Sequence, residues 1–122
     1  MKKILIGMAM MAALPGMAQT LANDTVKASF PGGEKALAEY IETNRKYPQT
    51  AANNGIEGIV DVKFLVKTDG SLEQLAIVRL VDPDLEAEAI RLVKEMPAWQ
   101  PATVGGTPID SESDVKVAFI LE

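Results

Sequence analysis

Alternating apolar and polar residues make Gly55–Gly70 the most strongly patterned stretch of the chain. Every second residue of Val60–Val66 is apolar, and Asp61 and Lys63 lie between them. A period of two is typical of a β-strand with one buried face. Further apolar residues interrupt the polar face, which favours a central position in a sheet. The predicted inward set is Val60, Val62, Phe64 and Val66.

A tight turn follows this strand. Asp69-Gly70 tolerates the positive φ that a short hairpin requires, so the chain is expected to return at once as a second strand over Leu72–Val81. The apolar residues of this second strand fall on both faces. A bulge near Glu73-Gln74 would bring them onto one face.

Two segments have the 3.6-residue periodicity of amphipathic helices. The first follows the turn Phe30–Gly33 and ends before Pro48, with one further turn expected over Gln49–Asn53. The second begins at Asp82-Pro83, an N-cap followed by a proline at the first helical position, and ends before Pro97. Its predicted buried stripe comprises Leu85, Ala89, Leu92, Val93 and Met96.

A last strand is predicted over Val115–Leu121, where apolar residues alternate again. The order helix, strand, strand, helix, strand predicts an α+β fold. A right-handed helical crossover makes the second and third strands parallel, so the third strand is expected beside the first. The result is a three-stranded antiparallel or mixed sheet in the order second, first, third, with both helices on one face. The last strand then lies at an edge, where its outer backbone groups are unpaired.

The N-terminal residues have the order of a secretory signal. Two lysines precede an apolar run from Ile4 to Leu14, and Gly16-Met17-Ala18 supplies small residues at its end. This pattern predicts a signal peptide over residues 1–18, cleaved after Ala18, a short leader over 19–29 and a domain over 30–122. The apolar run is shorter than the ~20 residues of a membrane-spanning helix, so export to the periplasm is preferred over retention in the inner membrane.

The composition restricts the chemistry that the chain can perform. It has no Cys and no His, which excludes thiol nucleophiles, disulfides and an imidazole base. A net charge of −5 provides no electrostatic basis for binding nucleic acid or anionic lipid. The acidic residues fall on predicted exposed helix faces and turns. We therefore expect no enzymatic activity, no cofactor, no small-molecule substrate and no nucleic-acid partner.

Three features each allow two interpretations. Asp110, Glu112 and Asp114 alternate, which suits either a hard cation or a solvated face that protects a sheet edge from aggregation. The solvated face is preferred, and no metal is expected. Trp99 either contacts a partner or packs on the core, and the core is preferred. Tyr47 belongs equally well to the core or to a contact surface.

An ordered set of motifs resembles the C-terminal domain of TonB. The resemblance begins with the turn Phe30–Gly33 and continues to the end of the chain. Its remaining motifs are Tyr47-Pro48, Gly55-Ile56-Glu57-Gly58, the alternating Val62, Phe64 and Val66, Asp69-Gly70, Leu85 with Glu88-Ala89, Met96-Pro97, Trp99, Pro101, and Val117 with Phe119.

TonB is an energy transducer whose C-terminal domain captures the TonB box of an outer-membrane transporter by adding it as a strand to its sheet. The resemblance implies the same capture in the periplasm, at the last predicted strand. The implied partner is an outer-membrane TonB-dependent transporter or another envelope protein, and the same edge permits a weak homodimer. The implied partner-binding residues are Tyr47, Pro48, Val115, Lys116, Val117, Ala118, Phe119, Ile120 and Leu121.

Two departures from the TonB pattern bear on function. No anchor helix or proline-rich spacer precedes Phe30, and the acidic residues before the last strand occupy a region that is often basic in relatives. The first departure predicts an accessory module that occupies TonB boxes without transmitting force. The alternative is a structural or scaffolding envelope protein that uses the same fold without binding a transporter.

Overall fold

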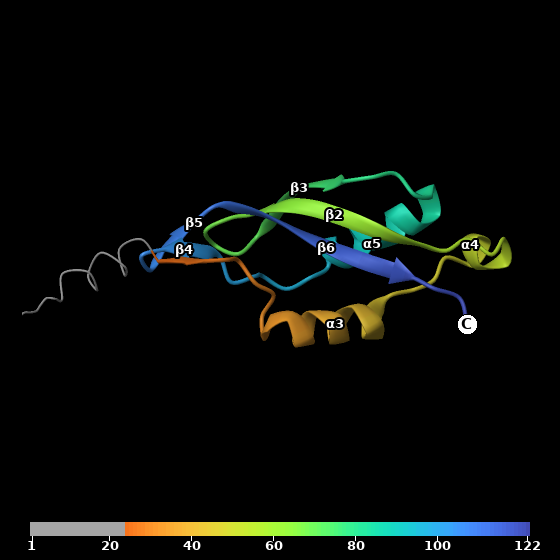
Figure 1. Ribbon diagram of the computed structural model, residues 1–122, viewed down its shortest axis with the longest axis horizontal. Coiled ribbons are helices and arrows are strands. Elements are labelled where there is room, and N and C mark those ends of the chain that lie inside the picture. Colours follow the sequence, from red (N-terminus) through yellow and green to blue (C-terminus); the bar gives the residue numbers. More distant parts are fainter. Residues whose placement is uncertain (1–23) are drawn as a thin grey trace, which may run out of the picture.

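The computed structural model describes residues 24–122 (Figure 1). The predicted signal peptide and residues 19–23 of the predicted leader lie outside the described residues. Within residues 24–122, no helix has the length and apolar character needed to cross a membrane.

The main sheet has the predicted strand order. β2 (Gly58–Val66) lies at the centre between β3 (Leu72–Ile77) and β6 (Ser111–Phe119), and it pairs with both in the antiparallel sense. The side chains of β2 alternate as expected, with the inward set buried. The prediction of a central strand next to an edge strand is therefore confirmed.

The predicted bulge in the second strand is also confirmed. The register of β3 on β2 shifts between Lys63 and Leu65, and Gln74 opposite this shift has a φ of 55°. The extra residue brings Leu72, Leu75 and Ile77 onto the core. β3 ends at Ile77 rather than at the predicted Val81. After the bond from the Val78 N–H to the Asp61 carbonyl, the chain leaves the sheet to reach the next helix.

The helices begin near the predicted signals but end before the prolines that were expected to stop them, the first at Asn44 and the second at Lys94, so Met96 lies beyond the second helix. α3 (Gly33–Asn44) begins after the turn at Phe30, and α4 (Gln49–Asn53) adds the short extra turn. In α5 (Pro83–Lys94) the side chain of the N-cap Asp82 accepts hydrogen bonds from the N–H groups of Asp84 and Leu85. Both α3 and α5 contribute to a core on one face of the main sheet (Figure 1).

This core is a single cluster that joins the main sheet to α3, α5 and the segment before β4. Trp99 lies in it between Phe30 and Phe64, with ring centroids 6.1 and 5.1 Å apart, so its core role is favoured over partner contact. The buried residues are Phe30, Ile41, Ala51, Val60, Val62, Phe64, Val66, Leu85, Ala89, Leu92, Val93, Trp99, Val115, Val117 and Phe119.

A second, smaller sheet does not follow from the sequence pattern. β1 (Thr25–Val26) pairs with β4 (Ala102–Val104), which pairs with β5 (Thr107–Ile109), all antiparallel. A bridge between Ser29 and Gln100 continues this pairing. Figure 1 shows the small sheet at the end of the molecule opposite α4. Residues 25, 26 and 29, which precede the predicted start of the domain at residue 30, therefore pair with residues 100–104.

The last strand is longer at its start and shorter at its end than predicted. β6 begins at Ser111 rather than Val115, because its pairing with β2 extends over the whole of β2, from Val66 opposite Ser111 to Gly58 opposite Phe119. Polar side chains occupy its first half, so the apolar alternation becomes visible only from Val115.

Candidate peptide-binding edge

The outer edge of β6 is the site that the sequence analysis predicted, and the hydrogen-bond pattern fixes which backbone groups it presents. In an antiparallel pair, the N–H and C=O of one residue point to the same side of its strand. The carbonyl of Asp61 accepts from Val78, so the backbone groups of Asp61 face β3. Its opposite residue on β6, Lys116, therefore directs its own groups away from β2.

This alternation divides β6 into two sets. The odd-numbered residues from Ser111 to Phe119 bond to β2, and the even-numbered residues direct their backbone groups outward. Among the described strands, β6 pairs with β2 alone. The outward set consists of Glu112, Asp114, Lys116 and Ala118.

The predicted strand residues are divided between these sets. Val115, Val117 and Phe119 have buried side chains, and their backbone groups face β2, so they support the edge without forming it. Lys116 and Ala118 belong to the outward set. Glu112 and Asp114 were not among the predicted site residues, because their polar alternation was interpreted as a solvated charged face.

The last two predicted residues lie beyond the strand. The Leu121 N–H donates to the Glu57 carboxylate at 2.6 Å, which holds the C-terminal end of the chain beside the start of β2. The side chain of Ile120 is exposed. These two residues therefore follow the edge without being part of the ladder.

Tyr47 and Pro48 lie at the same end of β6. The Tyr47 ring packs edge-on against Phe119, with centroids 5.6 Å apart, and its hydroxyl donates to the Ile56 carbonyl. Burial, with the nearby Glu57 carboxylate, raises the pKa of Tyr47, so the hydroxyl remains a donor. Pro48 is half-buried as the N-cap of α4. The packing of Tyr47 favours its core role.

Arg45 reaches the edge from the end of α3. Its Nη1 donates to the carbonyl oxygen of Ala118 at 3.0 Å, and its Nη2 lies 3.2 Å from Glu42 Oε2. This contact uses the outward carbonyl at the C-terminal end of β6. Arg45 was absent from the predicted site.

A groove runs along the other half of the edge. It has a volume of about 410 Å³ and lies between the segment Lys27–Phe30, the start of α3 and the β6 residues Ser113 and Asp114. A second groove of about 320 Å³ continues beside Ser111 and Glu112 towards the small sheet. Leu37 and Trp99 line the first groove, so its lining is partly apolar.

The acidic residues near the edge are mostly paired with lysines. Lys67 lies 3.0 Å from Asp110, and Lys116 lies 3.1 Å from Asp114 and 3.5 Å from Asp61. Burial and the adjacent Asp114 raise the pKa of Asp61, whereas the adjacent Asp61, which holds its proton to higher pH, and the Lys116 ammonium lower the pKa of Asp114. These contacts favour the interpretation of the acidic alternation as a solvated charged face.

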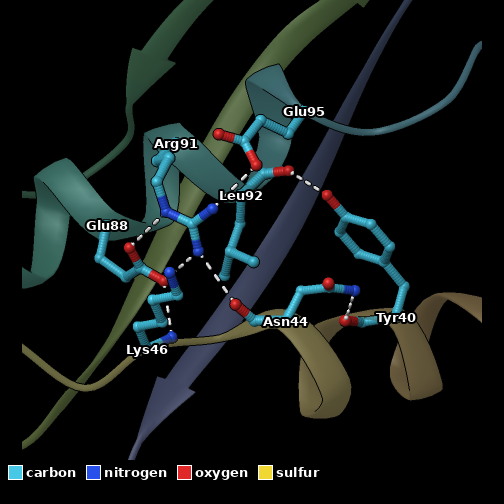
Figure 2. Close-up of polar contacts among 7 residues, drawn as sticks. All are labelled: Tyr40, Asn44, Lys46, Glu88, Arg91, Leu92 and Glu95. Carbon is cyan, nitrogen blue, oxygen red and sulfur yellow. Dashed lines mark hydrogen bonds and ion pairs between the residues drawn. The ribbon is translucent and has the colours of Figure 1, made fainter.

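A polar cluster joins the end of α3 to α5 (Figure 2). The Arg91 guanidinium makes a bidentate contact with the Glu88 carboxylate, in which Nε and Nη2 each donate to one carboxylate oxygen at 2.7 Å. Nη2 also donates to the Asn44 carbonyl at 2.9 Å. Glu88 also accepts from the Lys46 N–H at 2.7 Å, and the Tyr40 hydroxyl donates to the Leu92 carbonyl at 2.8 Å. Residues 44 and 46 are thus both held to α5, and Arg45 lies between them.

A comparison with known protein families shows which family this chain belongs to. The Gram-negative bacterial TonB protein C-terminal family matches residues 43–121. The chain belongs to this family. The TonB C-terminal family takes part in TonB-dependent transport and is associated with the bacterial envelope. No curated protein matches the chain.

Solved TonB C-terminal domains have the same fold. The NMR structure of Helicobacter pylori TonB residues 179–285 is 22% identical, with a TM-score of 0.53, and the match covers 70% of this chain and 77% of that chain. A second structure, of residues 194–285, is 22% identical with a TM-score of 0.50 and covers 70% and 89%. The predicted family and the α+β fold class are confirmed.

Proposed function

We propose that this TonB C-terminal domain binds an extended peptide, of the kind represented by the TonB box of an outer-membrane transporter, by adding it as a strand to β6. The observation that carries the proposal is the outward row of backbone groups on Glu112, Asp114 and Lys116. An edge of this kind pairs readily with a further strand. The pairing of the odd-numbered residues with β2 and the burial of Val115, Val117 and Phe119 support a fixed register for this row.

The grooves beside β6 supply the second requirement of strand addition. Main-chain bonds provide affinity, and pockets for alternate side chains provide selectivity. A strand paired with Glu112 and Asp114 would direct its inner side chains towards the groove that Leu37 and Trp99 line. We propose that this groove accepts an apolar side chain of the peptide.

The same reasoning gives the cellular setting. The N-terminal residues have the pattern of a secretory signal, and the transporter segments that TonB domains recognise face the periplasm. We propose that the protein acts there as a non-enzymatic binding module. Mass spectrometry of the exported protein tests this setting, because a mature form that begins at Gln19 supports it and one that retains Met1 contradicts it.

The binding experiment uses NMR of the exported protein during titration with a synthetic TonB-box peptide from a transporter of the same bacterium. Chemical-shift changes should concentrate on residues 111–118 and around Arg45–Tyr47, and a scrambled peptide should give none. Changes that cluster instead on the exposed face of α5 would place the site elsewhere.

Two substitutions at one outward position sharpen this test. Lys116→Pro removes an outward N–H while leaving the bonds to β2 in place, since proline is tolerated at an edge whose N–H faces solvent. It should weaken peptide binding by about tenfold or more, whereas Lys116→Ala, which retains the N–H, should change it by less than about threefold. Equal affinities for the two variants would rule out main-chain pairing at this edge.

A further inference from the structure

The contact between Arg45 and Ala118 occupies a backbone group that an added strand would require. Ala118 is the last residue of the outward set, and its carbonyl is already bonded to a guanidinium at 3.0 Å. A hydrogen bond from a charged donor is stronger than one from a neutral amide. A peptide strand therefore competes poorly for this carbonyl, whereas within residues 24–122 no arginine side chain bonds to the outward groups of Glu112, Asp114 and Lys116.

The position of Arg45 is fixed from both sides. Its own N–H donates to the Ile41 carbonyl at 2.8 Å, which closes the end of α3. The preceding carbonyl, of Asn44, accepts from Arg91, and the following N–H, of Lys46, donates to Glu88 (Figure 2). The Arg45 side chain is only 23% exposed and is also paired with Glu42. Its guanidinium is thus held in front of Ala118 by the α3–α5 connection.

The chain beyond Ala118 has the backbone orientation to extend the edge. The Leu121 N–H points to Glu57, on the β2 side, so the alternation of β6 continues past Phe119. Ile120 therefore lies just beyond the outward set with its backbone groups directed the same way, and its side chain is exposed. Without Arg45, an added strand could continue past Ala118 to Ile120.

We infer that Arg45 is a specificity-determining residue that ends the added strand at Ala118 and so sets the register and length of the peptide that β6 accepts. The inference rests on the proposed strand addition. Arg45 takes no part in the pairing of the peptide with Glu112, Asp114 and Lys116. Its effect is confined to the C-terminal end of the edge.

The test is amide hydrogen exchange of the exported protein with and without the synthetic TonB-box peptide, for the wild type and Arg45→Ala. In the wild type the peptide should protect the amides of Glu112, Asp114 and Lys116 and leave Ile120 unprotected. In Arg45→Ala the protection should extend to Ile120. The peptide should bind about two- to tenfold tighter, as expected for one additional hydrogen bond.

Two further variants control for charge and for folding. Arg79→Ala removes a positive charge from an exposed position away from the edge and should behave as the wild type. Arg45→Lys retains a charged donor and should keep Ile120 unprotected or only weakly protected. A structural defect caused by Arg45→Ala would instead appear as faster exchange of the β2 amides in the free protein.

The outcomes separate the two proposals. Protection of Glu112, Asp114 and Lys116 with no change at Ile120 in Arg45→Ala would overturn the role of Arg45 and leave strand addition intact. Protection of Ile120 in the wild type would also overturn it, because the peptide would then have displaced Arg45. Protection of no β6 amide in any variant would overturn both proposals.

Discussion

The two sheets of this domain are stabilised in different ways. In the main sheet, the inner side chains of β2 and the second half of β6 are fully buried against α3 and α5. In the small sheet, the side chains of β1 and β5 are exposed and only Ala102 of β4 is buried. Burial of apolar surface therefore stabilises the main sheet, whereas the small sheet depends chiefly on its backbone pairing.

This difference bears on how a binding edge is built. β6 has its inner face and its β2 side fixed by the main sheet, and its outer side borders the grooves that reach the small sheet. A strand that is fixed on one side can keep its register while its other side remains available for pairing. We expect substitutions to lower the free energy of unfolding strongly in the main sheet and only slightly in the small sheet.

The largest expected loss is at the centre of the main sheet. Phe64 is 1% exposed and packs edge-on against Trp99, so Phe64→Ala should cost about 3–5 kcal/mol through lost burial and a cavity. This is comparable with the whole stability of a small domain. Urea unfolding measures the loss. Lys63→Ala, on the opposite face of the same strand, should cost well under 1 kcal/mol. Similar losses would contradict the side-chain orientation of β2.

Two glycines with nearly equal φ allow a matched comparison of the sheets. Gly70 in the β2–β3 turn has a φ of 88°, and Gly106 in the β4–β5 turn has a φ of 85°. A Cβ on Gly70 would collide with the Trp99 carbonyl oxygen, whereas a Cβ on Gly106 would have no neighbour within 4 Å. Gly106→Ala should lower the free energy of unfolding only by the penalty of placing a residue with a Cβ in the left-handed conformation, about 1–2 kcal/mol.

Gly70→Ala adds a steric clash to that conformational cost. We expect a total of about 3 kcal/mol or more, since the backbone of Trp99 must move and its ring belongs to the core. Thermal unfolding of the two variants side by side provides the measurement. A smaller loss for Gly70→Ala than for Gly106→Ala would show that the turn and Trp99 are not in close contact.

The same contrast explains which parts of the fold the sequence could predict. The main sheet follows from alternation because burial imposes a period of two on β2, and Asp82 and Gln74 have local signatures that the structure confirms. The small sheet imposes no such period, because nearly all its side chains are exposed. Its pairing joins residues 25–26 to 103–104, a separation that local patterns cannot reveal.

Only the part of the candidate site that has buried side chains could be predicted from the sequence. Val117 and Phe119 identified the second half of β6 through their apolar alternation. Glu112 and Asp114 have polar side chains, and their importance lies in which way their backbone groups point. That direction depends on the bond between Val78 and Asp61, which has no side-chain signature. The contact of Arg45 with Ala118 joins residues 73 positions apart.

The polar connection between α3 and α5 should make stability depend on pH. Burial acts to raise the pKa of Glu88, but hydrogen bonds from Arg91 and the Lys46 N–H outweigh it, and the pKa is lowered from its ordinary value of 4.5. A lowered folded-state pKa stabilises the fold above the unfolded-state value, and this contribution is lost as the pH falls through the folded-state value.

Glu88→Gln should remove this contribution. The side chain of Glu88 is 9% exposed, so the variant should be less stable by about 1–3 kcal/mol at pH 7. The difference between the two proteins should shrink as the pH falls from 4.5 through the lowered folded-state pKa of Glu88, because the wild-type carboxylate is then protonated as well. Urea midpoints at neutral and acidic pH measure it. A difference that stays constant with pH would mean that the charge of Glu88 has no part in its contribution.

The smallest expected effect is in the small sheet, where Val104→Thr replaces a methyl group by a hydroxyl of the same shape. Val104 is 38% exposed, so the new hydroxyl can bond to water and the change should be within about 0.5 kcal/mol.

Val115→Thr makes the same replacement in β6 at a side chain that is 3% exposed. There the buried hydroxyl would lose its hydrogen bonds to water without gaining one from the protein, which should lower the free energy of unfolding by about 1–3 kcal/mol. Urea unfolding of this pair isolates burial from strand propensity, since both positions are in strands and the substituted atoms are identical. Equal losses at the two positions would mean that the small sheet is as deeply packed as the main one, and the division of the domain into a buried sheet and a surface sheet would fail.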